Sequence, residues 1–339
     1  MTRIVGYSRL PLLAYEHHYR PDEPSHCLVI KAVYQWDDEG HLTLLPRQPD
    51  WVLQDQFEGE PYRSSLRVQS DLTPRKPATD VTVVGKARPR DDKPVPAWLA
   101  ALEVGPIKKV LRLTGPRAWR WRLTGGWKLD APEPTEAVPL CFELAYGGLV
   151  ETATGRQVFE ANPLGRGFWG EAEPPRDQAH PAAQIESPDN PIQSISKIAR
   201  SVSCSPLADF FSDRCQFAGT PTDDPTPPDD FQLDFWQSAP LDQRAVPYLQ
   251  GGEVLRLIGF TPNGEVRLKL PQYRMRAILK WTDTLRETQL LDLDTVQVDL
   301  DARTLSLRWY TAIPFDEQLE EIAVLDTIDL LAASRAENA

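Results

Sequence analysis

The sequence lacks the features of a membrane or secreted protein. It contains no run of about 18 apolar residues, the length that a membrane-spanning helix needs. Residues 1–15 include Pro11 and have neither the apolar core nor the small-residue cleavage site of a signal peptide. The four cysteines lie far apart without a Cys-x-x-Cys pair, which predicts free thiols in a reducing compartment. We therefore expect a soluble cytoplasmic protein with no membrane span.

A surplus of basic residues is also missing. The chain has 37 Lys and Arg against 49 Asp and Glu, a net charge of −12, and its pI is near 5.0. Binding to nucleic-acid phosphates needs patches of Lys and Arg, so we expect no nucleic-acid partner. An acidic chain is compatible with basic or hydrophobic protein partners.

Patterns typical of catalytic and cofactor sites are scarce. There is no Gly-x-Ser-x-Gly motif, and His17, His18 and His26 do not follow a zinc-binding spacing. The glycine-rich segment 162–167 has no predicted strand before it or helix after it, as a nucleotide-binding loop requires. We expect no catalytic residue, cofactor or metal. One enzyme class stays open, a β-rich glycan-directed hydrolase, because it needs only two carboxylates about 5–10 Å apart.

Proline is abundant, with 32 residues, which favours short strands and long ordered loops. Alternating apolar residues and turn signals predict hairpins over residues 28–45, 97–114, 117–129, 254–270 and 295–310. Further strands are predicted over 51–57 and 138–146, and residues 149–191 are predicted to be irregular. Residues 318–331 fit a helix or a strand equally. In the predicted strand 117–123, we expect Trp119, Trp121 and Leu123 to pack on the core, with an exposed aromatic and cationic strip for a partner as the second interpretation.

One helix is predicted over residues 191–202, where Ile192, Ile195, Ala199 and Val202 recur at helical spacing. A second short helix is predicted from Ser205 to residue 215. The fold class is therefore mainly β, α+β at most, with two β-rich lobes of antiparallel hairpins and a short helical insert near 191–215. The predicted domains are an N-terminal β-rich lobe (1–150), a loop-rich connector with short helices (151–230) and a C-terminal β-rich lobe (231–339).

The segment 70–85, which carries the sequence SDLTPRKPATDV, is the most distinctive stretch. Pro74 and Pro77 exclude a helix interior, and residues 81–87 predict a buried strand directly after this loop. We expect Asp71, Lys76 and Asp80 to hold the two lobes together, with partner contact as the second interpretation.

A second motif, at residues 239–244, carries Asp242, Gln243 and Arg244. Asp242 and Arg244 can form a local ion pair, and Gln243 can satisfy backbone groups. If they are buried against the 70–85 loop, these residues are expected to clamp Lys76 and Asp80.

The order of these motifs resembles a bacterial domain-of-unknown-function family encoded beside VgrG and PAAR proteins in type VI secretion clusters. The matching elements include 70–85, Gly115…Arg117-x-Trp119, Tyr146-Gly147-Gly148, Asn162-Pro163-Leu164-Gly165-x-Gly167, Ala218-Gly219-Thr220 and Asp242-Gln243-Arg244. The resemblance implies an effector adaptor or chaperone, without catalytic residues or cofactor, that binds a toxic effector in the bacterial cytoplasm and helps load it onto the VgrG/PAAR spike. The chain departs from the family near 205–228, where it lacks two expected tryptophans.

The alternatives to an adaptor are the hydrolase and a structural component of the secretion particle. The candidate structural or partner-binding residues are Asp71, Lys76, Pro77, Thr79, Asp80, Trp119, Tyr146, Gly147, Gly148, Asn162, Pro163, Gly165, Asp242, Gln243 and Arg244.

Overall fold

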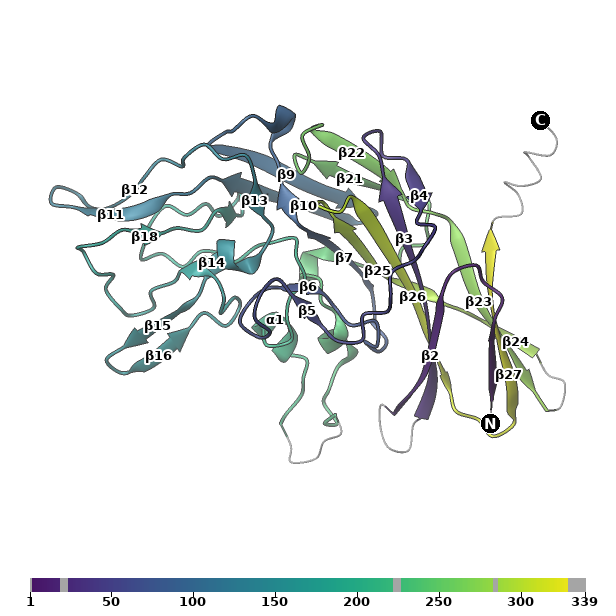
Figure 1. Ribbon diagram of the computed structural model, residues 1–339. Helices are drawn as coiled ribbons and strands as arrows, with labels where there is room; N and C mark the ends of the chain where they lie inside the picture. The colour runs from purple at the N-terminus through teal and green to yellow at the C-terminus, as the bar shows by residue number, and fades with distance from the viewer. Residues whose placement is uncertain (1, 19–23, 222–226, 283–285, 329–339) are drawn as a thin grey trace.

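Strands dominate the computed structural model, which describes residues 2–18, 24–221, 227–282 and 286–328 (Figure 1). The prediction of a mainly β protein is confirmed. The largest sheet has seven strands. Its order is β2 (Leu12–His18), β3 (Pro24–Trp36), β26 (Thr304–Pro314), β25 (Asp292–Asp299), β7 (Thr79–Val84) and β20 (Arg244–Ala245), with β4 (Leu42–Leu44) also on β3.

Strands distant in the sequence meet at the centre of this sheet. β3 and β26 pair antiparallel along eleven residue positions, from Gln35 opposite Thr304 to Ser25 opposite Pro314. β7 runs parallel to β25, with Asp80 beside Thr295. Strands on either side of the predicted boundaries at residues 150 and 230 therefore pair within one sheet.

The two faces of the seven-stranded sheet differ in polarity because side chains alternate along each strand. One face is apolar and belongs to the main hydrophobic core, which includes Val81, Val296 and Leu305. The opposite face is polar near the sheet centre. The register places Lys31 beside Arg308, Arg308 beside Thr295, Ser306 beside Gln297, and Gln297 beside Thr82.

Two further sheets pack on the same core. The five-stranded sheet has the order β19 (Ile185–Glu186), β10 (Ile107–Thr114), β9 (Ala97–Val104), β21 (Val254–Ile258) and β22 (Glu265–Lys269), and it contains the predicted hairpins 97–114 and 254–270. The four-stranded sheet has the order β1 (Arg3–Gly6), β27 (Leu319–Ile328), β23 (Tyr273–Trp281) and β24 (Arg286–Leu290). The ambiguous segment 318–331 is a strand over its described part.

Smaller pairings flank these sheets. They are β5 (Gln56–Phe57) with β6 (Leu66–Val68), β8 (Lys86–Ala87) with β13 (Val138–Pro139), β14 (Tyr146–Gly147) with β17 (Arg166–Gly167), β15 (Leu149–Thr152) with β16 (Gly155–Val158), and β11 (Ala118–Arg122) between β12 (Gly126–Leu129) and β18 (His180–Pro181).

Several predictions for this half of the chain are wrong in their extent. The strand expected over 138–146 is interrupted by a 3-10 helix, Phe142–Leu144, and the one over 51–57 is limited to β5. Residues 149–191, predicted to be irregular, contain the β15–β16 hairpin. Trp119 is buried as predicted, in a second hydrophobic cluster with Tyr146, whereas Leu123 at the hairpin turn is 99% exposed.

The helix predicted over 191–202 is wrong. Ile192, Ile195 and Ala199 are buried as their spacing suggested, but the backbone is not helical. Side chains hold this segment instead, because Ile192 N donates to Glu186 Oε2 (2.8 Å) and Arg200 N donates to Asn190 Oδ1 (2.9 Å).

Of the second predicted helix, only α1 (Ser212–Cys215) is present. It is the single α-helix in the described residues, beside 3-10 helices at Arg90–Asp92, Phe142–Leu144, Leu233–Trp236 and Leu241–Gln243. None of the helices among the described residues has the length and apolarity needed to span a membrane.

Candidate functional site

The predicted motif residues Lys76 and Asp80 form a buried ion pair beside the seven-stranded sheet. Lys76 Nζ lies 2.9 Å from Asp80 Oδ2, and the two side chains are 1% and 0% exposed. The Lys76 ammonium also donates to Thr295 Oγ1 on β25 (2.9 Å), which links residues 1–150 to residues 231–339. Asp80 Oδ2 accepts from the backbone N of Ser238 (2.8 Å), and Asp80 Oδ1 accepts from Gln237 Nε2 (3.2 Å). Both charges therefore have partners, as buried charges require.

The end of this loop that leads into β7 is fixed by further contacts. Thr79 Oγ1 donates to the carbonyl of Leu293 (2.5 Å) and accepts from the N–H of Leu249 (2.9 Å). The hydroxyl of Tyr248 donates to the carbonyl of Lys76, next to Pro77. The loop is thus fixed by tertiary contacts as well as by its prolines.

Two further pairs of buried charges lie next to the first. Lys31 Nζ binds Asp71 Oδ2 (2.8 Å), which also accepts from the backbone N of Val52 (2.8 Å). Arg308 Nη1 binds Asp294 Oδ2 (2.9 Å), and Arg308 Nη2 donates to the carbonyls of Asp71 and Thr73. Burial raises the pKa of Asp294, and the neighbouring Arg308 opposes that shift. These contacts anchor the loop on β3 and β26.

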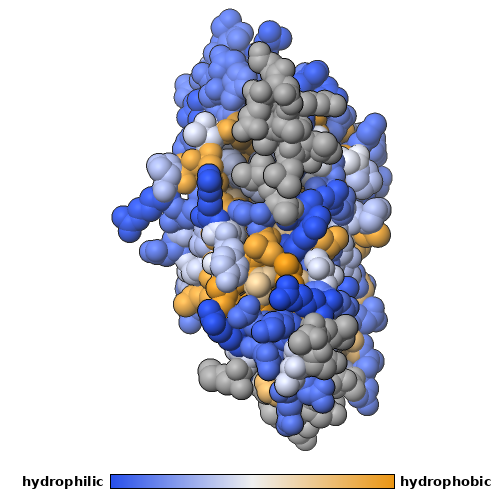
Figure 2. Space-filling model, turned by 90° about the vertical axis from the view of Figure 1, so that its right-hand side faces the viewer, coloured by the Kyte–Doolittle hydropathy of each residue, from blue (hydrophilic) through white to orange (hydrophobic). Residues whose placement is uncertain are grey.

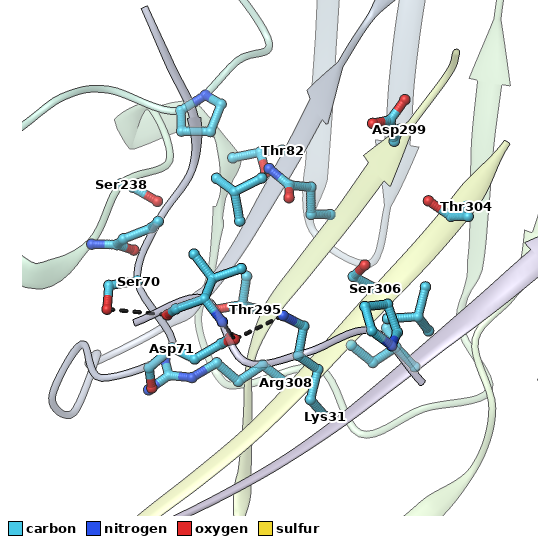
Figure 3. A pocket seen from close by; sticks show the side chains of 18 of the residues that line it. Lys31, Ser70, Asp71, Thr82, Ser238, Thr295, Asp299, Thr304, Ser306 and Arg308 are labelled. Carbon is cyan, nitrogen blue, oxygen red and sulfur yellow. Dashed lines mark hydrogen bonds and ion pairs between the residues drawn. The ribbon is translucent and has the colours of Figure 1, made fainter. Parts of the chain in front are cut away.

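A cavity of about 320 Å³ opens beside these ion pairs, on the polar face of the seven-stranded sheet (Figure 3). We call it the sheet pocket. Strands β3, β7, β25 and β26 form its floor, and residues 45–52, 68–71, 206 and 238 contribute its walls. Lys31, Asp71 and Arg308 lie at one end, and Asp299 and Thr304 lie at the other (Figure 3).

Apart from the exposed Asp50, the charged groups of the sheet pocket are held by partners within the chain, whereas several uncharged groups are available. Asp299 Oδ2 binds Arg67 Nη2 (2.7 Å), and its Oδ1 accepts from the backbone N–H groups of residues 301 and 302. Within the described part of the chain, the hydroxyls of Thr304 and Ser306 have no hydrogen-bond partner. Gln297 Nε2 donates to the carbonyl of Arg67 (2.8 Å), which leaves its side-chain oxygen facing no donor among the described residues.

The motif residues of the middle region form a separate structural unit. Asn162 is completely buried, and its Nδ2 donates to the carbonyls of Phe142 (2.8 Å) and Tyr146 (3.1 Å). β14 and β17 pair in parallel, which brings Gly147 beside Gly167. The segment 146–148 and the turn 162–167, which includes Pro163, therefore contact each other.

The glycines of this unit are required by close backbone contacts. A Cβ on Gly147, where φ is +150°, would lie 2.2 Å from the carbonyl oxygen of Asn162. A Cβ on Gly148 would lie 2.6 Å from the carbonyl oxygen of Gly165, and one on Gly165 would lie 2.8 Å from that of Ala145. No side chain fits where the backbone segments come this close together, so the glycines of this motif are needed for the packing of the two segments.

Of the 242–244 motif, Arg244 lies beside the Lys76–Asp80 pair, whereas Asp242 binds a lysine elsewhere in the chain. Arg244 pairs with Asp80 in the β20–β7 register, and burial lowers the pKa of the Arg244 guanidinium. Gln243 Nε2 donates to the carbonyls of residues 81 (2.7 Å) and 204 (3.2 Å), as expected for a group that satisfies the backbone. Asp242 binds Lys109 Nζ (2.8 Å), so the expected local pair with Arg244 is wrong.

Sequence reasoning missed most of the sheet pocket. The missed residues are Lys31, Thr82, Thr295, Gln297, Thr304, Ser306 and Arg308. In the sequence, these residues are the polar positions of strands that alternate polar and apolar residues. That pattern ordinarily marks the solvent-facing side of a sheet.

A scan against protein-family models matches residues 22–310 to DUF2169, described as an uncharacterized protein conserved in bacteria. The chain belongs to the DUF2169 family. The DUF2169 match includes every residue that lines the sheet pocket and both motif units described above. Searches of curated proteins and of solved structures gave no match.

Proposed function

We propose that this DUF2169 protein is a non-enzymatic adaptor or chaperone. It binds a cognate type VI secretion effector in the bacterial cytoplasm and helps to load that effector onto the VgrG/PAAR spike. The proposal starts from the ordered motifs that resemble the adaptor family. The observation that supports it best is that the charged groups Lys31, Asp71, Lys76 and Arg308, which line the sheet pocket, are bound by partners within the chain. Such a pocket is suited to recognition.

Catalysis of hydrolysis requires a group that is available to transfer a proton or to attack. Of the three carboxylates that line the pocket, Asp71 and Asp299 are bound by Lys31 and Arg67, which leaves only the exposed Asp50 and supports the hydrolase alternative poorly. Burial raises the pKa of the Cys204 thiol to about 12, so it is protonated near neutral pH and is a weak nucleophile.

The molecular surface also favours a protein partner. Figure 2 shows hydrophobic residues gathered in the middle of one face, between hydrophilic ends. Large apolar side chains are exposed on or directly after strands β1, β24 and β26, including Tyr7 (59%), Leu290 (51%) and Phe315 (46%). Exposed apolar groups rimmed by polar residues are typical of protein interaction sites.

Affinity purification from the native bacterium tests this proposal. We expect a tagged protein to retain a toxin encoded by a neighbouring gene, or VgrG or PAAR, in the cytoplasmic fraction. Retention of none of them, from cells that express the secretion system, would contradict it. A structural component would instead accompany the secreted spike in fixed stoichiometry.

A further inference from the structure

We propose that the sheet pocket binds a short, extended and uncharged segment of polypeptide. Only the assignment of that segment to the effector rests on the proposed function. The peptide chemistry is argued from the pocket itself. Its volume of about 320 Å³ is near the lower end for ligand sites, which suits a few residues of chain and excludes a folded element.

The electrostatics of the pocket favour an uncharged ligand. Lys31 with Asp71, Lys76 with Asp80, and Arg308 with Asp294 are paired at 2.8–2.9 Å. A charged ligand group would have to compete with these buried partners, and breaking a buried pair is costly. A neutral ligand can bind without disturbing them.

The available polar groups repeat at the spacing of an extended chain. Thr304 and Ser306 are two residues apart on β26, a distance of about 7 Å along a strand, and their hydroxyls point into the pocket (Figure 3). Each hydroxyl can both donate and accept a hydrogen bond. Gln297 lies beside Ser306 in the sheet register and adds its side-chain oxygen as an acceptor, since its Nε2 already donates to Arg67 and Thr82. An extended peptide presents N–H and C=O groups with the same two-residue repeat.

The walls of the pocket suit peptide side chains. Leu45, Val52, Val68 and the two prolines 49 and 206 line it, so small apolar side chains of a bound segment can be covered. No aromatic side chain lines the sheet pocket among the described residues, and a flat aromatic platform for a sugar ring is therefore missing.

Methyl NMR on the full chain tests this inference without knowledge of the effector. The probe is a positional-scanning library of N-acetylated, C-amidated hexapeptides, with chitobiose and inorganic phosphate as separate comparisons. We expect at least one peptide pool to shift the methyl resonances of Val33, Val52 and Val68, and we expect neither comparison to do so. Ser306→Trp, which fills the pocket, should weaken peptide binding at least tenfold, while Thr288→Trp on exposed β24 should leave it within twofold.

A gentler variant keeps the test valid if Ser306→Trp does not fold. Removing both hydroxyls, in Thr304→Ala/Ser306→Ala, should weaken binding about thirtyfold, since each hydrogen bond contributes roughly 1 kcal/mol and about 1.4 kcal/mol is a factor of ten. Peptide pools that leave these methyl groups unshifted at millimolar concentration would overturn the inference. So would shifts caused by chitobiose or phosphate alone, or peptide binding that is unchanged in the double variant. Retention of an effector with no peptide binding in this pocket would refute only the inference.

Discussion

The ammonium of Lys76 and the carboxylate of Asp80 form a 2.9 Å ion pair whose side chains are excluded from solvent. The pair lies where the proline-rich loop enters β7, and Thr295 on β25 binds the same ammonium. A loop close in sequence to β7 is thereby tied to a strand more than 200 residues away. Removing one partner of a buried ion pair leaves an uncompensated buried charge, which is strongly destabilising.

Replacing Lys76 tests this role. In Lys76→Met, the Asp80 carboxylate loses its cation while still buried, so the free energy of unfolding should fall by about 3–5 kcal/mol. Urea unfolding followed by tryptophan fluorescence measures this change. Lys76→Ala should likewise lower soluble yield before it lowers effector binding.

The matched control for Lys76 is an exposed pair. Arg63 lies 3.5 Å from Glu60 with both side chains largely in solvent, so Arg63→Met should change stability by less than about 1 kcal/mol. Equal stability of Lys76→Met and the wild type would show that the buried pair does not hold the fold. A fully stable Lys76→Met that no longer binds the effector would assign the loop to partner contact.

The close contact between segment 146–148 and the turn 162–167 leads to a steric prediction. A Cβ on Gly165 would lie 2.5 Å from Asn162 Nδ2 and 2.8 Å from the Cα of Gly147. Gly165→Ala should therefore lower the thermal midpoint and destabilise the fold by about 1–3 kcal/mol. Gly59→Ala is the control, because its Cβ would meet only the Ser64 side chain at 3.4 Å. Equal midpoints for the two variants would refute the packing role.

The raised pKa of the buried Cys204 thiol predicts that the protein loses stability at alkaline pH. Burial raises the pKa of this thiol from the ordinary value of 9.0 to about 12. Above pH 9 the unfolded chain loses this proton while the folded chain keeps it. The free energy of unfolding should therefore fall with pH between 9 and 12, by about 1.4 kcal/mol per pH unit from this group.

Urea titrations at pH 8, 9, 10 and 11 check the prediction for Cys204. Cys204→Ala should flatten the decline with pH, whereas Cys215→Ala should alter it less because Cys215 is exposed. A decline that is as steep in Cys204→Ala as in the wild type would contradict the assignment.

Local patterns predicted the hairpins of this fold well. Strands β9 and β10 alternate apolar and polar residues around Gly105, and β21 and β22 do so around Gly264, so neighbouring residues determine both the strands and the turns. The loop over residues 72–78 and the buried strand after it were also predicted, because Pro74 and Pro77 exclude a helix interior and the residues that follow are β-branched.

Long-range contacts explain what the sequence did not predict. The apolar spacing of residues 191–202 matched a helix, but Glu186 and Asn190 supply acceptors to its backbone and hold a different conformation. The sheet pocket depends on the pairing of β3 with β26 and of β7 with β25, in which the paired residues are more than 200 positions apart. Neither pairing leaves a local signal, so the polar residues Gln297 and Ser306 were indistinguishable from an ordinary solvent face.

The amount of effector that the native bacterium releases is the measurement that tests the central claim most directly. It should be compared in the wild type, in a strain lacking this protein, and in that strain with the gene restored. An adaptor predicts that release of one effector is lost in the deletion and recovers with the gene, while the spike itself is still secreted. Release of every effector at the wild-type level in the deletion strain would contradict the adaptor function.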